Sequence, residues 1–202
     1  MTLAGVVAFG LAAASVSHAA PKSAPPKSPL TYTADGKMAY PADYRTWVYL
    51  STGVDMSYSD APSSSDAHTF DSVFVNPEAY AVYQKTGTWP DKTVMVLEVR
   101  RGASKGSINK KGQFQAEKFG AEVHVKDVKR FSSGWAFFPF ANGDKPAAAL
   151  AQTSQCNVCH EKHGAVDTTF VQFYPTLIAK AQEMKTMSAA YLAEEKAAAE
   201  AK

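Results

Sequence analysis

The sequence lacks an excess of charge of either sign, and it is poor in cysteine. Lysine and arginine number 21 against 19 aspartate and glutamate residues, and these charges are mixed along the chain rather than gathered in blocks. Nothing in this pattern indicates a nucleic-acid partner. Two cysteines in an exported chain form a disulfide by default. Because Cys156 and Cys159 lie three positions apart and His160 follows directly, that default has to be tested against a cofactor.

The N-terminus lacks an apolar run long enough to span a bilayer comfortably. Leu3 to Val16 is apolar and Ala-rich, about 14 residues against the roughly 20 that a spanning helix needs. Small residues follow at Ser17 and Ala19, in the positions that a signal peptidase reads. No lysine or arginine precedes the run, which indicates a neutral leader or a missing start, and an uncleaved membrane anchor is the alternative. We expect residues 1–19 to be a signal peptide for export to the periplasm, with no membrane attachment after its removal.

The remainder of the chain predicts one domain behind a tether. The segment from Pro21 to Pro29 is rich in Pro and Ser and has no bulky apolar side chain before Leu30, so it cannot bury enough surface to fold. We assign residues 20–39 to a flexible linker and residues 40–202 to a single folded domain of ordinary size.

Short β-type runs dominate the domain up to about residue 140. They are rich in Val, Phe, Tyr and Trp and are bounded by Gly, Pro, Asp and Ser; the runs are Thr46–Ser51, Phe70–Asn76, Thr93–Arg100, Ala116–Val128 and Trp135–Phe140. Asn76 and Pro77 form an N-cap and first-turn pair, and Gly87 can end a helix. These signals predict a short helix over Pro77–Lys85 between the strands.

Helix-prone sequence follows the last strand. Lys145–Gln152 is Ala-rich, and Pro175–Lys202 carries apolar residues at helical spacing, which predicts a terminal helix, frayed beyond Leu192. The expected fold class is α+β, predominantly an antiparallel β-sheet with a few helices. Among these helices are one that carries residues 156–160 and a C-terminal helix.

Cys156-Asn157-Val158-Cys159-His160 is the motif with the most specific chemistry in the chain. A c-type haem needs two thiols that each add to a vinyl group, and an imidazole that reaches the iron from the same side. Cys-x-x-Cys-His supplies all three within one helical turn. The motif predicts one haem c per chain, bound covalently through Cys156 and Cys159, with His160 as an axial ligand of the haem iron.

Two other interpretations of the motif are weaker. A thioredoxin-like redox pair is expected early in a βαβ unit, whereas this pair lies late in the chain after a β-rich region. A structural zinc site needs a second pair of ligands, and the chain has no further cysteine. Ligation by His163 would crowd all four zinc ligands into one short loop. Oxidising conditions in the exported compartment also suit haem attachment.

The second axial position of the iron stays open at the level of sequence. Electron-transfer cytochromes commonly fill it with Met or His, whereas ligand-binding haem proteins leave it free or block it sterically. His163 lies three residues from His160, so it belongs to the same side of the iron. The remaining candidates for this position are His68, His124, Met38, Met56, Met95, Met184 and Met187. Methionines more often fill the core than bind a metal, and the sequence does not exclude His68 or His124.

Further motifs are spread over the folded domain. They are Tyr44-Arg45-Thr46-Trp47-Val48, Asn76-Pro77-Glu78-Ala79-Tyr80, Lys85-Thr86-Gly87, Glu122, Val125-Lys126-Asp127, Lys129-Arg130-Phe131, Trp135-Ala136-Phe137 and Phe170-Val171-Gln172-Phe173-Tyr174-Pro175. Together with the haem motif, they resemble the β-rich cytochromes P-460 and their relatives, the cytochromes c′-beta. This resemblance implies an antiparallel sheet with a few helices, a homodimer, and a five-coordinate haem with an open distal face.

One position departs from the P-460 proteins that oxidise hydroxylamine, in which a strand lysine forms an additional covalent bond to the haem. Alignment on neighbouring residues places Leu97 at that position; these residues are Gly87, Asp91, Thr93, Val94 and Glu98. A leucine cannot form the bond. The nearest lysines, Lys85 and Lys92, lie outside the strand, and Lys85 is the alternative residue for a covalent bond to the haem. The resemblance therefore favours a cytochrome c′-beta, with an ordinary haem c and Leu97 in its distal pocket.

Glu122 falls where the family has a distal-pocket carboxylate that accepts protons from substrate, which would make it a catalytic residue. The strand pattern supports a plainer interpretation, because apolar side chains at positions 121, 123 and 125 alternate with Glu122, His124 and Lys126. On a half-buried strand this places Glu122 on the polar, solvated face. A haem pocket is where a sheet can tolerate an inward carboxylate, so both interpretations stay open.

Three functions are compatible with these residues. The first is a periplasmic mono-haem c-type cytochrome whose five-coordinate iron binds NO or a similar small nitrogen species. The second is a hydroxylamine-oxidising enzyme that passes electrons to a redox partner protein. The third is an electron-transfer cytochrome c with a six-coordinate iron. Leu97 favours the first over the second, Glu122 argues mildly the other way, and the lack of a distinctive sixth ligand weakens the third.

Overall fold

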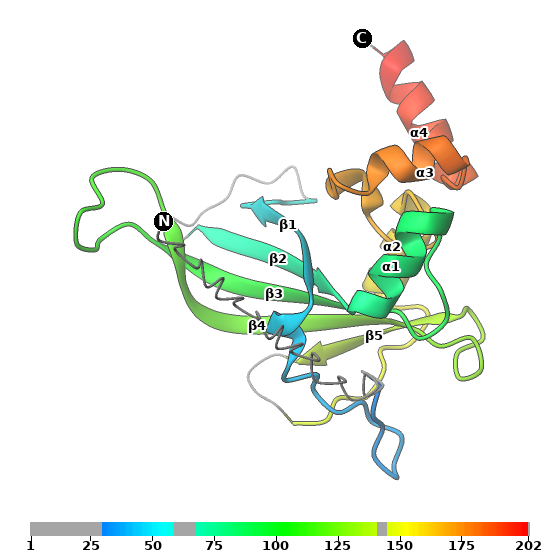
Figure 1. The fold of residues 1–202 in the computed structure, drawn as a ribbon, viewed down its shortest axis with the longest axis horizontal. Coiled ribbons are helices and arrows are strands. Elements are labelled where there is room, and N and C mark those ends of the chain that lie inside the picture. The colour runs from blue at the N-terminus through cyan, green and yellow to red at the C-terminus, as the bar shows by residue number, and fades with distance from the viewer. Residues whose placement is uncertain (1–29, 59–67, 141–144, 202) are drawn as a thin grey trace, which may run out of the picture.

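The computed structural model describes residues 30–58, 68–140 and 145–201. Five strands in these ranges form one antiparallel sheet in the order β1-β2-β3-β4-β5, so each strand pairs with its neighbours in sequence (Figure 1). The strands are β1 (Val48–Val54), β2 (Thr69–Val75), β3 (Val94–Ala103), β4 (Phe114–Lys126) and β5 (Trp135–Phe140). The predicted α+β class, dominated by an antiparallel sheet, is confirmed.

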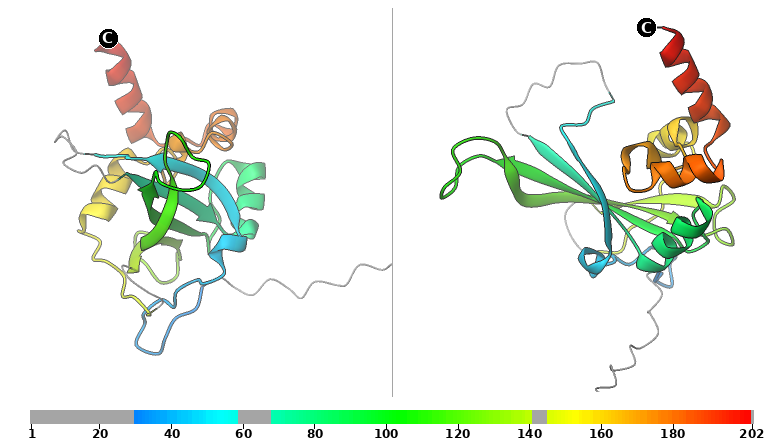
Figure 2. Two further views of the ribbon diagram at one scale, coloured as in Figure 1. Left: turned by 90° about the vertical axis from the view of Figure 1, so that its left-hand side faces the viewer. Right: turned by 45° about the horizontal axis from the view of Figure 1, so that its top comes forward.

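Four α-helices accompany the sheet: α1 (Pro77–Thr86), α2 (Gln155–His163), α3 (Ile178–Met184) and α4 (Ala189–Glu200). The predicted helix after Asn76 is confirmed as α1, and Gly87 ends it in the left-handed conformation (φ 69°) that glycine adopts without strain. Figure 2 shows the helices gathered near one end of the sheet, with the β3–β4 hairpin extending away from them. None of the helices in the described ranges is long and apolar enough to cross a membrane.

The Ala-rich segment Lys145–Gln152 is not a helix, and that prediction is wrong. Ala147 and Met38 exchange two backbone hydrogen bonds, of 2.8 and 2.9 Å. The Leu150 N–H donates to the Phe137 carbonyl at 2.8 Å. Because these bonds satisfy the backbone in an extended form, pairing with the rest of the fold outweighs the helix propensity of alanine.

The terminal segment after Pro175 forms two helices rather than the single helix expected. The first ends at Met184, and Lys185 follows as its C-cap with a left-handed backbone (φ 56°). The second begins after Ser188, whose hydroxyl accepts a backbone N–H of the first turn, and it continues to Glu200 instead of fraying beyond Leu192. Local caps of this kind divide a segment whose apolar spacing looks continuous.

The folded domain begins earlier than the predicted boundary at residue 40. Residues 30–39, which we assigned to the linker, lie against the sheet: Met38 is fully buried and bridges both Tyr32 and Ala147. This part of the linker prediction is wrong, because composition near the prolines does not show that a later side chain has a partner on the sheet. The predicted signal peptide and the rest of the linker lie outside the described residues.

The sheet separates two apolar clusters. On the helix side, side chains such as Val75, Tyr83 and Trp89 pack with residues that follow α2. On the opposite side, the N-terminal segment covers a second cluster that includes Phe74 and Val123. Successive side chains of a strand point to opposite faces. The even-numbered residues of β4, from Glu122 to Lys126, therefore face the helix side.

A buried ionic cluster ties the N-terminal segment to the back of the sheet. Glu98 on β3 has no exposed side-chain surface. It accepts hydrogen bonds from the Tyr44 hydroxyl, from Arg45 Nη1 at 2.6 Å and from Arg100 Nε at 2.7 Å. Burial alone would raise the pKa of Glu98, but the hydrogen bonds from Arg100, Tyr44 and Arg45 hold that pKa at about 2, below the usual 4.5.

We expect the fold to lose stability in acid through this carboxylate. The pKa of Glu98 is lower in the folded chain than in the unfolded one, so its contribution is complete above about pH 4.5 and is lost as the pH falls toward about 2. The loss amounts to at most roughly 3 kcal/mol. Urea unfolding at about pH 7 and about pH 3 should show a larger loss for the wild type than for Glu98→Gln. Equal losses would contradict this account.

Candidate haem site

The N-terminal half of α2 is held by its own polar residues. The Ser154 hydroxyl accepts the Asn157 backbone N–H at 3.4 Å, and the buried Asn157 side-chain amide donates to the Ala151 carbonyl at 3.0 Å. Cys159 and His160 follow Cys156 by three and four positions, so all three side chains lie on one face of the helix. All three line a single cavity.

The thiols of Cys156 and Cys159 are both free. Burial raises the pKa of the Cys156 thiol, and the negative charge of Glu122 raises it further. Two free thiols on one helix face can each add across one vinyl group of a haem.

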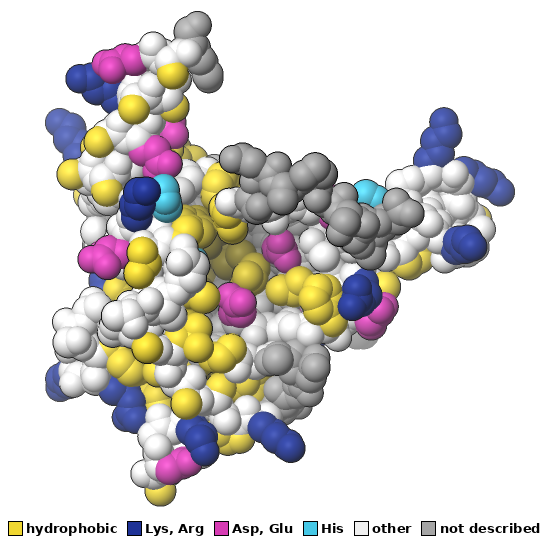
Figure 3. Space-filling model, turned by 180° about the vertical axis from the view of Figure 1, so that it is seen from behind, with side chains coloured by type: hydrophobic (Ala, Val, Ile, Leu, Met, Phe, Trp, Pro, Cys, Tyr) yellow, Lys and Arg dark blue, Asp and Glu magenta, His cyan; other side chains and the backbone are white. Residues whose placement is uncertain are grey.

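The cavity lies between the helix side of the sheet and the segments that carry and follow α2. Its volume is about 760 Å³, in the range of pockets that hold cofactor-sized ligands. Figure 3 shows a hollow lined with hydrophobic side chains, with acidic side chains at its margin. The apolar walls include Val73, Met95, Leu97, Phe137, Phe170 and Phe173.

The imidazole of His160 is oriented by a backbone carbonyl. Its Nδ1 lies 2.7 Å from the Thr168 carbonyl oxygen, which can only accept, so Nδ1 carries the proton and donates it. Nε2 is then the unprotonated nitrogen that can bind a metal. The ring stacks on Phe170 with centroids 4.0 Å apart, and burial lowers the pKa of His160. The neutral imidazole suits an axial ligand.

The two remaining predicted site residues lie side by side in this cavity. Leu97 and Glu122 are direct partners across β3 and β4, and both line the cavity. The polar face of β4 is therefore the wall of a cavity that is open to solvent at Glu122, which is exposed, and closed at His124, which is only 6% exposed. Burial raises the pKa of Glu122, and the charge of Asp71 raises it further.

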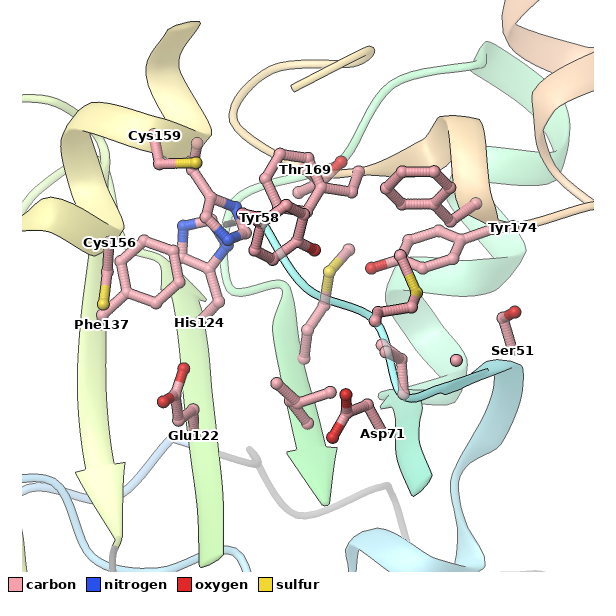
Figure 4. A pocket seen from close by; sticks show the side chains of 18 of the residues that line it. Ser51, Tyr58, Asp71, Glu122, His124, Phe137, Cys156, Cys159, Thr169 and Tyr174 are labelled. Atoms are coloured by element: carbon pink, nitrogen blue, oxygen red, sulfur yellow. The ribbon is translucent and has the colours of Figure 1, made fainter. Parts of the chain in front are cut away.

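Asp71 is a second carboxylate of the cavity, which the sequence did not single out. It lies on β2, two residues before Val73, the strand partner of Leu97. Figure 4 shows Asp71 and Glu122 projecting into the cavity from the strands, below Cys156, Cys159 and His124. Burial raises the pKa of Asp71, with a further contribution from Asp55. The sequence did not identify Asp71 because polar and apolar residues are mixed along this strand, so the pattern does not show which face of the sheet the carboxylate occupies.

Comparison with known families gives one decisive match. The family model of cytochrome P460 matches residues 41–171, more than half of the chain, including positions 97, 122 and 156–160. The chain belongs to the cytochrome P460 family. No match was found among curated proteins. As a member of this family, it is a c-type haem cytochrome, and the free thiols, the unprotonated His160 Nε2 and the apolar cavity fit such a haem.

Of the candidates for the second axial position in this P460 cytochrome, His124, Met56 and Met95 line the cavity. His124 contacts His160 edge-on, with ring centroids 5.2 Å apart. Two imidazoles on opposite sides of one metal, at about 2 Å from it, have centroids more than about 6 Å apart. The centroids of His124 and His160 are therefore too close together for the two rings to bind opposite sides of one metal ion.

The other candidate side chains have different partners. His68 pairs with Asp55, and His163 pairs with Glu194 of α4. Met38 lies in the apolar cluster on the far side of the sheet. No lysine is among the described residues that line the cavity, and Lys92 forms an ion pair with Asp127.

Proposed function

We propose that this P460 cytochrome binds NO or a similar small nitrogen species at a five-coordinate haem iron. One observation carries the proposal: a single helix face brings two free thiols and an available imidazole nitrogen to the wall of one largely apolar cavity. Cys156 and Cys159 would hold one haem c by thioether bonds, and His160 Nε2 would bind its iron. The haem supplies an iron with one free coordination position, where a diatomic ligand binds.

The walls of the cavity support a neutral ligand. Leu97 and Val73 lie on adjacent strands beneath the cavity, and Phe170 and Phe173 line it from the segment after α2. Such side chains offer no positive charge to an anion, whereas a neutral diatomic ligand needs none.

The coordination of the iron can be tested on the wild-type protein. We expect acid-acetone extraction to leave the haem on the chain, and the reduced protein to show the optical spectrum of a five-coordinate, high-spin haem. Free haem in the solvent would contradict the covalent attachment of the haem to Cys156 and Cys159. A six-coordinate, low-spin spectrum would instead support electron transfer, and Met56→Leu and Met95→Leu would then identify the ligand.

We also expect no bond between a lysine and the haem. Leu97 cannot form one, and the described residues that line the cavity include no lysine. Mass spectrometry of the digested protein should find the haem attached only to the peptide that contains Cys156 and Cys159. A second attached peptide containing Lys85 or Lys92 would contradict the binding function and favour the hydroxylamine enzyme.

Oxidation of hydroxylamine is the second candidate, and the two cavity carboxylates favour it. Glu122 and Asp71 both have raised pKa values, which brings a carboxylate closer to the range of an effective general base. Glu122 is the residue that we would assign to accept a proton from the substrate. Electrons would pass to a redox partner protein.

The location and assembly are proposed on sequence grounds. The apolar run from Leu3 to Val16 supports export to the periplasm, and the family resemblance supports a homodimer. Fractionation of cells that express the full chain, followed by analytical ultracentrifugation of the mature protein, tests both. Cytoplasmic retention or a monomer at micromolar concentration would contradict them.

A further inference from the structure

The loop Asp167–Thr169, which follows α2, is anchored on both flanks. Asp167 forms an ion pair with Lys126 of β4 at 3.0 Å. Thr169 is almost fully buried, and its hydroxyl accepts a hydrogen bond from Trp89 Nε1 at 2.9 Å. The sheet and the turn after α1 therefore fix the ends of a loop whose middle residue is Thr168.

The same loop approaches the end of α2 through backbone contacts. A Cβ built on Gly164 would lie 2.9 Å from the Thr168 carbonyl carbon and 2.7 Å from the His160 carbonyl oxygen. Real Cβ atoms do not come so close to backbone atoms, so only glycine lets the loop reach the helix here. This approach allows the Thr168 carbonyl to accept the His160 Nδ1–H.

Thr168 also contacts the sheet, through His124 of β4. The His124 Nε2 lies 3.3 Å from the Thr168 hydroxyl oxygen. The His124 ring is fixed by neighbouring rings: it stacks on Phe137 at 3.8 Å and 9°, and it contacts Trp135 at 4.4 Å. A buried ring nitrogen needs a hydrogen-bond partner, and the Thr168 hydroxyl supplies it.

We propose that His124 is a positioning residue for the axial ligand, holding Thr168 so that its carbonyl receives the His160 N–H. The inference rests on the proposed binding of iron by His160. A firm hydrogen bond from Nδ1 makes Nε2 more basic, which strengthens its bond to the iron and favours the ferric state. Loosening Thr168 therefore raises the reduction potential and weakens the bond between the iron and His160.

Two substitutions in the haem-bound protein each remove one partner of the contact between His124 Nε2 and the Thr168 hydroxyl. Thr168→Val deletes the hydroxyl and keeps the backbone carbonyl, whereas His124→Phe keeps the stacked ring and deletes Nε2. Each variant should raise the midpoint potential and lower the iron–histidine stretching frequency of the reduced protein in resonance Raman spectra. The affinity of His160 for the iron should fall by about tenfold, the lower end of the effects seen for outer-shell partners of metal ligands.

A double variant and a conservative variant show whether the two groups act through the same hydrogen bond. Because both groups act through one hydrogen bond, His124→Phe combined with Thr168→Val should shift the potential no further than either change alone. Thr168→Ser, which keeps the hydroxyl, should restore wild-type values. If His124→Phe does not fold, Thr168→Val against Thr168→Ser decides the question alone.

Two results would overturn the proposal: wild-type potentials and stretching frequencies in Thr168→Val, or shifts that add in the double variant. Failure of the wild-type chain to retain haem, or to bind its iron through His160, is a separate outcome. It would remove the proposed function before any variant is compared.

Discussion

Replacing both Cys156 and Cys159 by serine is expected to abolish covalent haem attachment completely. Each thiol adds across one vinyl group, its sulfur bonding to one carbon and its hydrogen going to the other, and a serine hydroxyl does not do this. Both thiols are free and face the same cavity. Mass spectrometry of the purified variant should show the bare polypeptide, and acid-acetone extraction should move any haem into the solvent.

The single variants and a matched control refine this result. Cys156→Ser and Cys159→Ser should each keep one thioether, so haem and chain stay linked but with one vinyl group intact. Val158→Ser is the control, because Val158 lies between the two cysteines on the exposed side of α2, 48% exposed. That variant should retain its haem fully. Covalent haem in the double variant would show that another side chain makes the attachment.

Replacing Glu122 by glutamine is expected to separate ligand binding from catalysis. NO carries no proton to be accepted, so its affinity should be nearly unchanged. Any oxidation of hydroxylamine should fall by about 10²-fold or more, the usual contribution of a positioned general base. Because burial and Asp71 raise the pKa of Glu122, such activity in the wild type should increase with pH through a pKa above 4.5. Stopped-flow NO binding and steady-state hydroxylamine assays give the two measurements.

Glu117→Gln is the control for the Glu122 change, since Glu117 is an exposed carboxylate of the same strand and pairs with Arg101. It should alter neither measurement. Fast hydroxylamine turnover in the wild type, falling steeply in Glu122→Gln alone, would mean that the binding function has to be abandoned in favour of the enzyme.

Leu97→Ala addresses access to the cavity from the strand opposite Glu122. The smaller side chain should enlarge the cavity and speed NO binding, without affecting the covalent attachment of the haem. Val99→Ala removes a similar side chain two residues along β3, outside the described cavity lining. It should leave the NO binding rate unchanged, and equal effects of the two changes would show that Leu97 does not control access.

The sequence by itself determined the features whose cause is local. The spacing of Cys156, Cys159 and His160 places three reactive groups on one helix face whatever surrounds them. Runs of β-branched and aromatic residues between turn signals located all five strands to within a few residues. The Asn76, Pro77 and Gly87 signals likewise bounded α1.

Only the tertiary structure decided which polar residues face the cavity and which partners they meet there. The alternation around Glu122 is the same whether the polar face meets water or a cavity wall, because a pattern of period two does not say what covers the face. The helix propensity of Lys145–Gln152 lost to pairing with Met38, a contact over a hundred residues away in the sequence. The contacts of Thr168 with His160 and with His124 depend on how a loop lies against the sheet, and no local spacing encodes that arrangement.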